Sequence, residues 1–172
     1  DWAFGLPSFA YTDSKTLPAI LSDFAVPTDG QESPWGRAQL VFAYDSRYAE
    51  TPPRSAAALA KWIGANPGRF SYPQPPDFTG TSFLKQIALE LAPDRSVFMM
   101  PAETADKDAA LGPLWQWLET VHPDLWRGGT SYPANYTDMV QLLGDGELSF
   151  AMAFNPAEFS NGIASGVLPE TV

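Results

Sequence analysis

The chain has 172 residues, a formal net charge of −10 and no cysteine. Its length suits one domain or little more. So acidic a chain offers no basic patch for nucleic acid and little attraction to an anionic membrane surface. The absence of cysteine excludes disulfide bonds, thiolate metal sites and cysteine catalysis. No apolar run reaches the roughly 18 residues of a membrane-spanning helix, so we expect no membrane insertion.

Residues 1–38 carry no sustained hydrophobic period and are interrupted by prolines and glycines. We expect an extended arm here, with a short strand near 24–26, that approaches a lobe formed by residues 39–172. The chain begins without methionine and ends beyond a helix stop signal. We therefore expect a fragment of a longer protein, with any signal peptide outside it.

The lobe is predicted to open with a strand at 39–45, whose apolar and aromatic residues are typical of a strand covered on both faces. A helix over 56–65 follows, with Ser55 as its cap. Further expected elements are a strand at 69–72, helices at 82–92 and 109–121, a helix capped by Asn135 or Thr137, a strand at 148–154 and a last helix after Asn155. This alternation predicts an α/β fold with a mostly parallel central sheet flanked by helices. Residues 94–108 give no clear pattern.

The helix expected at 109–121 carries two tryptophans. Its apolar stripe is predicted to hold Leu111, Leu114, Trp115 and Leu118. On this assignment Trp115 lies in the core and Trp117 faces the other way.

A rigid loop leads into the helix expected at 82–92. Three prolines, Pro73, Pro75 and Pro76, force it to be extended, and it runs into the hydroxyl-rich residues 79–82. The first N–H groups of a helix have no internal partner and carry partial positive charge, so such a start can hold a polar or anionic ligand. An ordinary capped turn is the alternative, because Ser and Thr are common caps.

The sequence gives little support to catalysis. It contains no P-loop, no nucleophile elbow and no zinc-binding helix motif. The single histidine, His122, is interpreted as a helix-end residue that interacts with the helix dipole rather than as a general base. We therefore expect no enzyme, no metal and no cofactor. Two alternatives remain open: a small α/β enzyme that uses carboxylates or hydroxyls, and a protein-interaction module that uses loop tryptophans such as Trp126.

Several motifs resemble the periplasmic solute-binding components of ABC importers. They are Pro34-Trp35-Gly36, the strand at 39–45, Pro67-Gly68-Arg69-Phe70, residues 75–80 and residues 138–148. Within that superfamily the chain looks like the YnjB-like group, which is related to thiamine, iron and polyamine binders. The resemblance covers about residues 23–166. It implies that the chain is the inserted second lobe of a two-lobed type II periplasmic-binding fold.

The resemblance also implies a function. Such proteins capture a small solute in the cleft between two lobes, close, and dock on the membrane permease of an ABC importer, without chemistry. The location would be periplasmic or otherwise extracytoplasmic. An organic cation such as thiamine or a polyamine is one solute class that it suggests. Iron is less expected, because no tyrosine pair of the ferric-binding kind is evident in the sequence.

Ligand-binding residues can be carried over by position. The resemblance places Trp35 and Gly36 on the hinge side of the cleft and Asn155 at the mouth of the last strand. Tyr72 and Tyr132 would supply walls. The hydroxyls and backbone N–H groups at the helix start would come from Thr79, Gly80, Thr81 and Ser82.

Overall fold

The computed structural model describes residues 21–23, 26–29, 38–101, 103, 106–155 and 157–172. The chain divides into two units, residues 1–38 and 39–172, which are described separately. In the first unit β1 (Ser22–Asp23) pairs in antiparallel fashion with β2 (Val26–Pro27). The predicted ligand contacts Trp35 and Gly36 lie outside the described residues.

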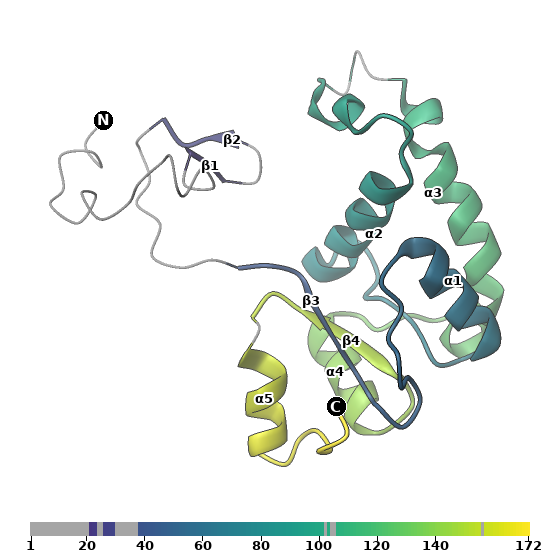
Figure 1. Cartoon of the computed structure of the whole chain (residues 1–172), viewed down its shortest axis with the longest axis vertical. Helices are drawn as coiled ribbons and strands as arrows, with labels where there is room; N and C mark the ends of the chain where they lie inside the picture. The colour runs from purple at the N-terminus through teal and green to yellow at the C-terminus, as the bar shows by residue number, and fades with distance from the viewer. Residues whose placement is uncertain (1–20, 24–25, 30–37, 102, 104–105, 156) are drawn as a thin grey trace, which may run out of the picture. The chain divides into compact units, whose positions relative to one another are not determined.

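A two-stranded sheet runs through the second unit (Figure 1). β3 (Val41–Tyr44) pairs with β4 (Phe150–Ala153), with Val41 opposite Ala153. Both strands were predicted from their apolar runs. The mostly parallel sheet is wrong for the described residues, because both sheets found there are antiparallel. Four α-helices and three short 3-10 helices separate β3 from β4 among the described residues, and so long a connection allows the second strand to return in either direction.

The predicted strand at 69–72 is not found, because residue 69 lies in a bend and residues 70–72 have no regular secondary structure. Its backbone oxygens are instead used singly: the Ser149 N–H donates to Arg69 O at 2.9 Å, and the Trp126 N–H donates to Phe70 O at 2.8 Å. Phe70 is inaccessible to solvent. The segment therefore connects the sheet to the loops beyond it without extending the sheet.

The α-helices described in the second unit are α1 (Ala56–Ala65), α2 (Phe78–Leu91), α3 (Lys107–Val121), α4 (Tyr136–Gly144) and α5 (Ala157–Ala164). Short 3-10 helices are η4 (Arg95–Met99), η5 (His122–Asp124) and η6 (Trp126–Gly129). The predicted bounds of α1 and its cap Ser55 are confirmed. Asn135, one of the two expected caps, begins α4. No helix among the described residues is both long enough and apolar enough to cross a membrane.

The core corrects the assignment of the two tryptophans on α3. Trp117 is only 7% exposed and its indole N–H donates to Ala56 O at 2.9 Å, whereas Trp115 is 53% exposed. The buried stripe of α3 is Ala110, Leu114, Trp117, Leu118 and Val121. Both stripes have helical spacing, and the choice between them depends on where α1 and α2 pack, which the spacing alone does not give.

Candidate functional site

Three helix starts are linked in a closed ring of contacts on the second unit. The ring of Phe78, the first residue of α2, lies 4.8 Å from the ring of Phe154, which precedes α5. The hydroxyl of Tyr136, the first residue of α4, donates to Glu158 Oε1 in α5 at 3.4 Å. The Gln74 N–H donates to Pro133 O at 2.8 Å and joins the loop before α2 to the loop before α4. We call this arrangement the helix-start ring. It contains Gln74, Asp77, Phe78, Pro133, Asn135, Tyr136, Phe154, Asn155 and Glu158.

Each of these helices is capped by a side chain of its own. Asp77 Oδ1 accepts from the N–H groups of Thr79 and Gly80 at 2.9 and 3.0 Å. Asn135 Oδ1 accepts from Asp138 N, and Asn155 Oδ1 accepts from Ala157 N, both at 3.0 Å. Caps of this type satisfy backbone donors that have no partner inside the helix. The ring is therefore built from helix starts whose first donors are already occupied.

This capping corrects the expected start of α2. The helix begins at Phe78, four residues before the predicted Ser82, because Asp77 caps it. The N–H groups of Thr79 and Gly80, which were predicted to face a ligand, both donate to Asp77, and ligand contact at these residues stays a prediction. Thr79 is buried, whereas Thr81 and Ser82 are half-buried within α2 and Asn155 is exposed.

Gly80 has a packing role. A Cβ atom built on it would lie 1.8 Å from Pro73 O. Only a residue without a side chain lets the proline loop lie this close to the helix. Gly80 thus positions the loop, and the structure does not place it as a ligand contact.

Tyr72 and Tyr132 lie next to each other, and both lie beside His122. The Tyr72 hydroxyl lies 2.8 Å from His122 Nε2, and the rings of Tyr72 and Tyr132 are 5.3 Å apart. Burial raises the pKa of Tyr72 and lowers the pKa of His122, so both are neutral near pH 7. Tyr72 is 4% exposed and Tyr132 is half-buried, and their expected role as walls of a cleft stays a prediction. The partner of His122 is thus a tyrosine, and its neutral state does not favour the expected interaction with the helix dipole.

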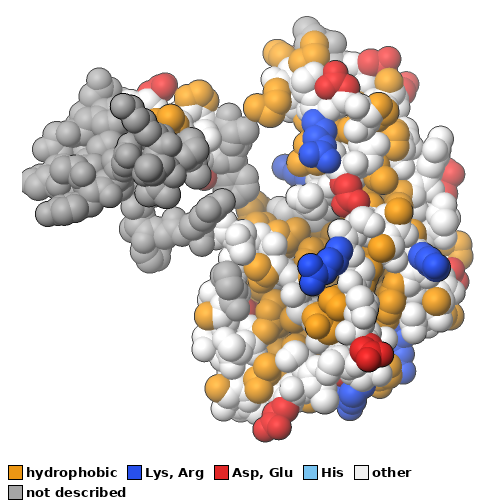
Figure 2. Space-filling model, viewed as in Figure 1, with side chains coloured by type: hydrophobic (Ala, Val, Ile, Leu, Met, Phe, Trp, Pro, Cys, Tyr) orange, Lys and Arg blue, Asp and Glu red, His pale blue; other side chains and the backbone are white. Residues whose placement is uncertain are grey.

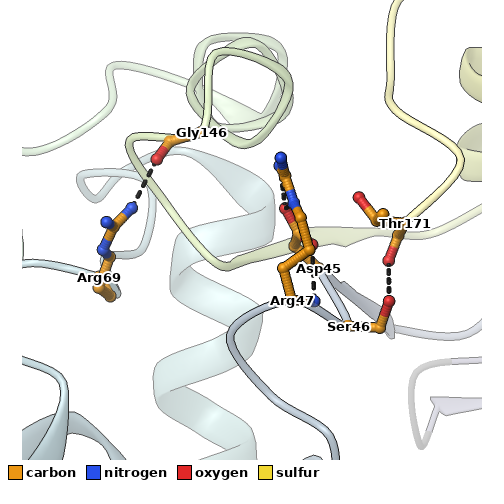
Figure 3. A network of polar contacts seen from close by, with 6 residues as sticks. All are labelled: Asp45, Ser46, Arg47, Arg69, Gly146 and Thr171. Atoms are coloured by element: carbon orange, nitrogen blue, oxygen red, sulfur yellow. Dashed lines mark hydrogen bonds and ion pairs between the residues drawn. The ribbon is translucent and has the colours of Figure 1, made fainter.

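A second polar cluster lies at the end of β3 (Figure 3). The Asp45 carboxylate is inaccessible to solvent and accepts from the backbone N–H of Arg47 and from its guanidinium. These bonds hold the pKa of Asp45 below its ordinary value. Figure 3 draws two further links, from Ser46 to Thr171 O at 2.8 Å and from Arg69 to Gly146 O at 2.6 Å. These bonds fix the chain at the end of β3, and the buried Thr171 hydroxyl is left without a hydrogen-bond partner among the described residues.

Support for catalysis or metal binding is not found in the described part of the chain. It holds no group of three or more His, Asp or Glu side chains arranged to take a metal ion. Of its shifted carboxylates, Asp45 is paired with Arg47, and the pKa of Asp94 is lowered by the backbone N–H of Ser96. Trp126, the candidate for protein interaction, is half-buried, with its indole N–H on Glu147 Oε2 and the Arg127 guanidinium over its ring.

The sequence interpretation missed the residues that define the helix-start ring, apart from Asn155. Asp77 was detectable, because Asp is at least as strong a helix cap as Ser or Thr. Phe78 and Phe154 were not, since an aromatic residue beside a helix or strand usually packs in the core. Phe78 is 56% exposed.

Comparison with known proteins agrees with a binding role. Residues 5–164 match the family model described as bacterial extracellular solute-binding protein, and the chain belongs to this family. Its sequence is 44% identical over 168 residues to Protein YnjB of Escherichia coli (strain K12), a match that covers 98% of the chain. The chain spans only 43% of the length of that relative. Membership of the family suggests a binding protein rather than an enzyme.

Proposed function

We propose that the protein is the substrate-binding component of an ABC importer and that the helix-start ring contacts a small organic cation. The family match supports solute binding. The observation that supports a cationic ligand is the negative charge of the ring itself. Its segments, residues 74–82, 132–139 and 154–160, contain Asp77, Asp138 and Glu158 and no Lys, Arg or His.

The carboxylates outweigh the helix dipoles. A helix N-terminus is equivalent to about half a positive charge, so three of them offset about half of three carboxylates. Asp77 Oδ1 is committed to the cap, but Asp77 Oδ2 has no hydrogen-bond partner among the described residues. A cation therefore meets an attractive field at the ring, and an anion meets carboxylates where free N–H groups had been expected.

The aromatic residues of the ring suit an organic rather than an inorganic cation. The rings of Phe78 and Phe154 lie 4.8 Å apart with an angle of 39° between their planes, and the ring of Tyr136 comes from the neighbouring helix start. An ammonium group over an aromatic face is attracted by about 0.5–2 kcal/mol, depending on how far it is desolvated. Thiamine and polyamines both carry such cationic nitrogen.

The rest of the proposed function concerns the whole protein. We infer that the solute is captured outside the cytoplasm, in the periplasm, between this chain and a second lobe, and is passed to a membrane permease. The description of the family as extracellular supports this location. Closure on the solute requires that the solute bind the closed state more tightly than the open one.

Calorimetric titration of the full-length protein with a panel of solutes tests the proposal. The panel contains thiamine and spermidine as organic cations and glutamate and phosphate as anions. We expect at least one organic cation to bind and both anions to bind at least about tenfold more weakly. Preferential binding of an anion would contradict the assignment of the ring, whereas binding of a neutral solute alone would leave a solute-binding protein with a different specificity.

A further inference from the structure

A cavity of about 320 Å³ lies in the second unit among the β3–β4 sheet, the start of α1 and the middle of α2. Most of its lining is aromatic or aliphatic, from Phe42, Tyr44, Leu59, Phe83, Ile87 and Phe150. This volume lies within the range of small-molecule pockets, which are mainly apolar with a few polar groups. Of the ligand-binding residues predicted from the sequence, the seven that the structure describes do not line it.

The polar residues of the cavity are not equivalent. Glu90 Oε1 accepts from the Ala56 N–H at 2.7 Å, so its charge offsets the positive end of α1. Arg54 is exposed and forms no ion pair within the described residues. With the start of α1 counted as about half a positive charge, Glu90 and Arg54 leave the mouth with a net charge of about +0.5, in a chain whose net charge is −10. Figure 2 shows basic and acidic side chains beside hydrophobic ones on the visible face of this unit.

We propose that this cavity is a second binding site, for a small amphipathic carboxylate. The aromatic or branched apolar part of the ligand packs on Phe42 and Tyr44, the more accessible aromatic side chains of the lining, and is thereby removed from water. Its carboxylate lies at the mouth and pairs with the Arg54 guanidinium, whose planar donors match a carboxylate in two-point geometry. A cation of the same shape would face Arg54 instead and is disfavoured.

This site does not depend on the helix-start ring. Asp77 and Phe78 belong to the first turn of α2, whereas Phe83, Gln86 and Glu90 lie one to three turns further along the helix. The two sites also select opposite charges. Failure of the cation titration would therefore leave this proposal standing, and the reverse also holds.

The test uses 4-phenylbutyrate as the probe and 4-phenylbutylamine, which has the same apolar body and a cationic head, as its counterpart. Binding to the full-length protein is measured by calorimetry and by the change in its total tryptophan fluorescence, to which Trp117 contributes through its contact with the cavity residue Ala56. We expect 4-phenylbutyrate to bind at millimolar concentration or below and the amine to bind about tenfold more weakly.

Three variants locate the binding. Arg54→Gln should weaken 4-phenylbutyrate about fivefold, as expected for a partly exposed ion pair. Lys85→Gln makes the same charge change on α2 at a residue that does not line the cavity, and should leave binding unchanged. Gln86→Trp places a large side chain at an exposed position of the lining and should weaken binding by more than about tenfold.

Four outcomes would overturn the proposal: no binding of 4-phenylbutyrate at millimolar concentration, equal or tighter binding of the amine, equal weakening by Lys85→Gln, or binding unaffected by Gln86→Trp. Sedimentation of the wild-type protein and of Gln86→Trp completes the set. A concentration-dependent dimer that the substitution disrupts would show that a second copy of the chain fills the cavity, and this would also overturn it.

Discussion

A carboxylate caps a helix start at each end of α2, but the two caps have different surroundings. At the first turn Asp77 caps its own helix, beside an exposed aromatic residue and two other helix starts. Near the last turn Glu90 caps a different helix, α1, at the edge of an apolar cavity. Both carboxylates are used as caps, but only one lies among further carboxylates.

What surrounds each carboxylate decides which charge its region attracts. Around Asp77 the neighbouring groups are Asp138 and Glu158, so the field remains negative. Around Glu90 the start of α1 offsets about half of the carboxylate charge and Arg54 offsets the rest, so the net charge there is slightly positive. A helix start therefore does not by itself identify an anion site, because the cap is part of the electrostatics.

The largest expected effect is a loss of folding stability when the buried tryptophan of α3, which packs near the cavity, is removed; removing the exposed tryptophan of the same helix should matter little. Trp117→Ala should destabilise the fold by about 3–5 kcal/mol, because it removes a buried ring that packs on Phe83 and a hydrogen bond to Ala56. Trp115→Ala, on the same helix but 53% exposed, should cost less than about 0.5 kcal/mol. Chemical denaturation measures both, and equal losses would contradict the observed face of α3.

A smaller loss of folding stability is expected from a substitution in the first turn of α2. Gly80→Ala should destabilise by about 1–3 kcal/mol, because its Cβ would overlap Pro73 O and force the proline loop away from the helix. Gly112→Ala is the matched control, since nothing lies within 4 Å of its Cβ in α3. There the gain in helix propensity is offset by the clash of the new Cβ with the ring of Pro113, so the stability should change by less than about 0.5 kcal/mol. Equal destabilisation by the two substitutions, or a neutral Gly80→Ala, would be inconsistent with this packing.

Lowering the pH should reduce the local stability of the proline loop more than that of the helix that lines the cavity. Burial lowers the pKa of His122, so the unfolded chain binds the proton more tightly than the folded one. The contribution of His122 is thus complete above its ordinary pKa of about 6.5 and declines as the pH falls through that value. Because His122 bonds to Tyr72, protection from hydrogen exchange, corrected for the pH dependence of the intrinsic rate, should fall between pH 7 and 5 more in residues 72–80 than in residues 83–90.

His122→Gln supplies the control for this prediction, because an amide can still bond to the Tyr72 hydroxyl but does not titrate. The variant should show a weaker dependence of exchange on pH in residues 72–80. An unchanged dependence would assign the effect to another group.

The local elements were largely predictable from the sequence. The apolar runs that became β3 and β4 and the capped pattern of α1 depend on neighbours along the chain, which the sequence contains. The direction of β4 and the buried face of α3 depend on packing across long connections. The spacing of Trp115 and Trp117 suits either phase of the helix, so the error there came from missing tertiary information.

The sequence predicted the positions of the helix starts in the candidate site better than it predicted which of their donors are free. The loop before α2 and Asn155 are indeed at helix starts, but the donors expected to hold a ligand are occupied by Asp77. A single residue, Asp77, just before the predicted segment 79–82, occupies these donors. The contacts that close the helix-start ring, Phe78 with Phe154 and Tyr136 with Glu158, join segments far apart in sequence and leave no local pattern.

The most direct test of the central claim, that the helix-start ring attracts a cation, is the affinity of Asp77→Asn in the full-length protein for the cation that the titration identifies. Asn is as good a cap as Asp, so the fold and its unfolding temperature should change little while the charge is lost. Asp94→Asn, the same change at the cap of η4 outside the ring, is the control. We predict about tenfold weaker cation binding for Asp77→Asn and unchanged binding for Asp94→Asn. Wild-type affinity in a folded Asp77→Asn protein would contradict the account.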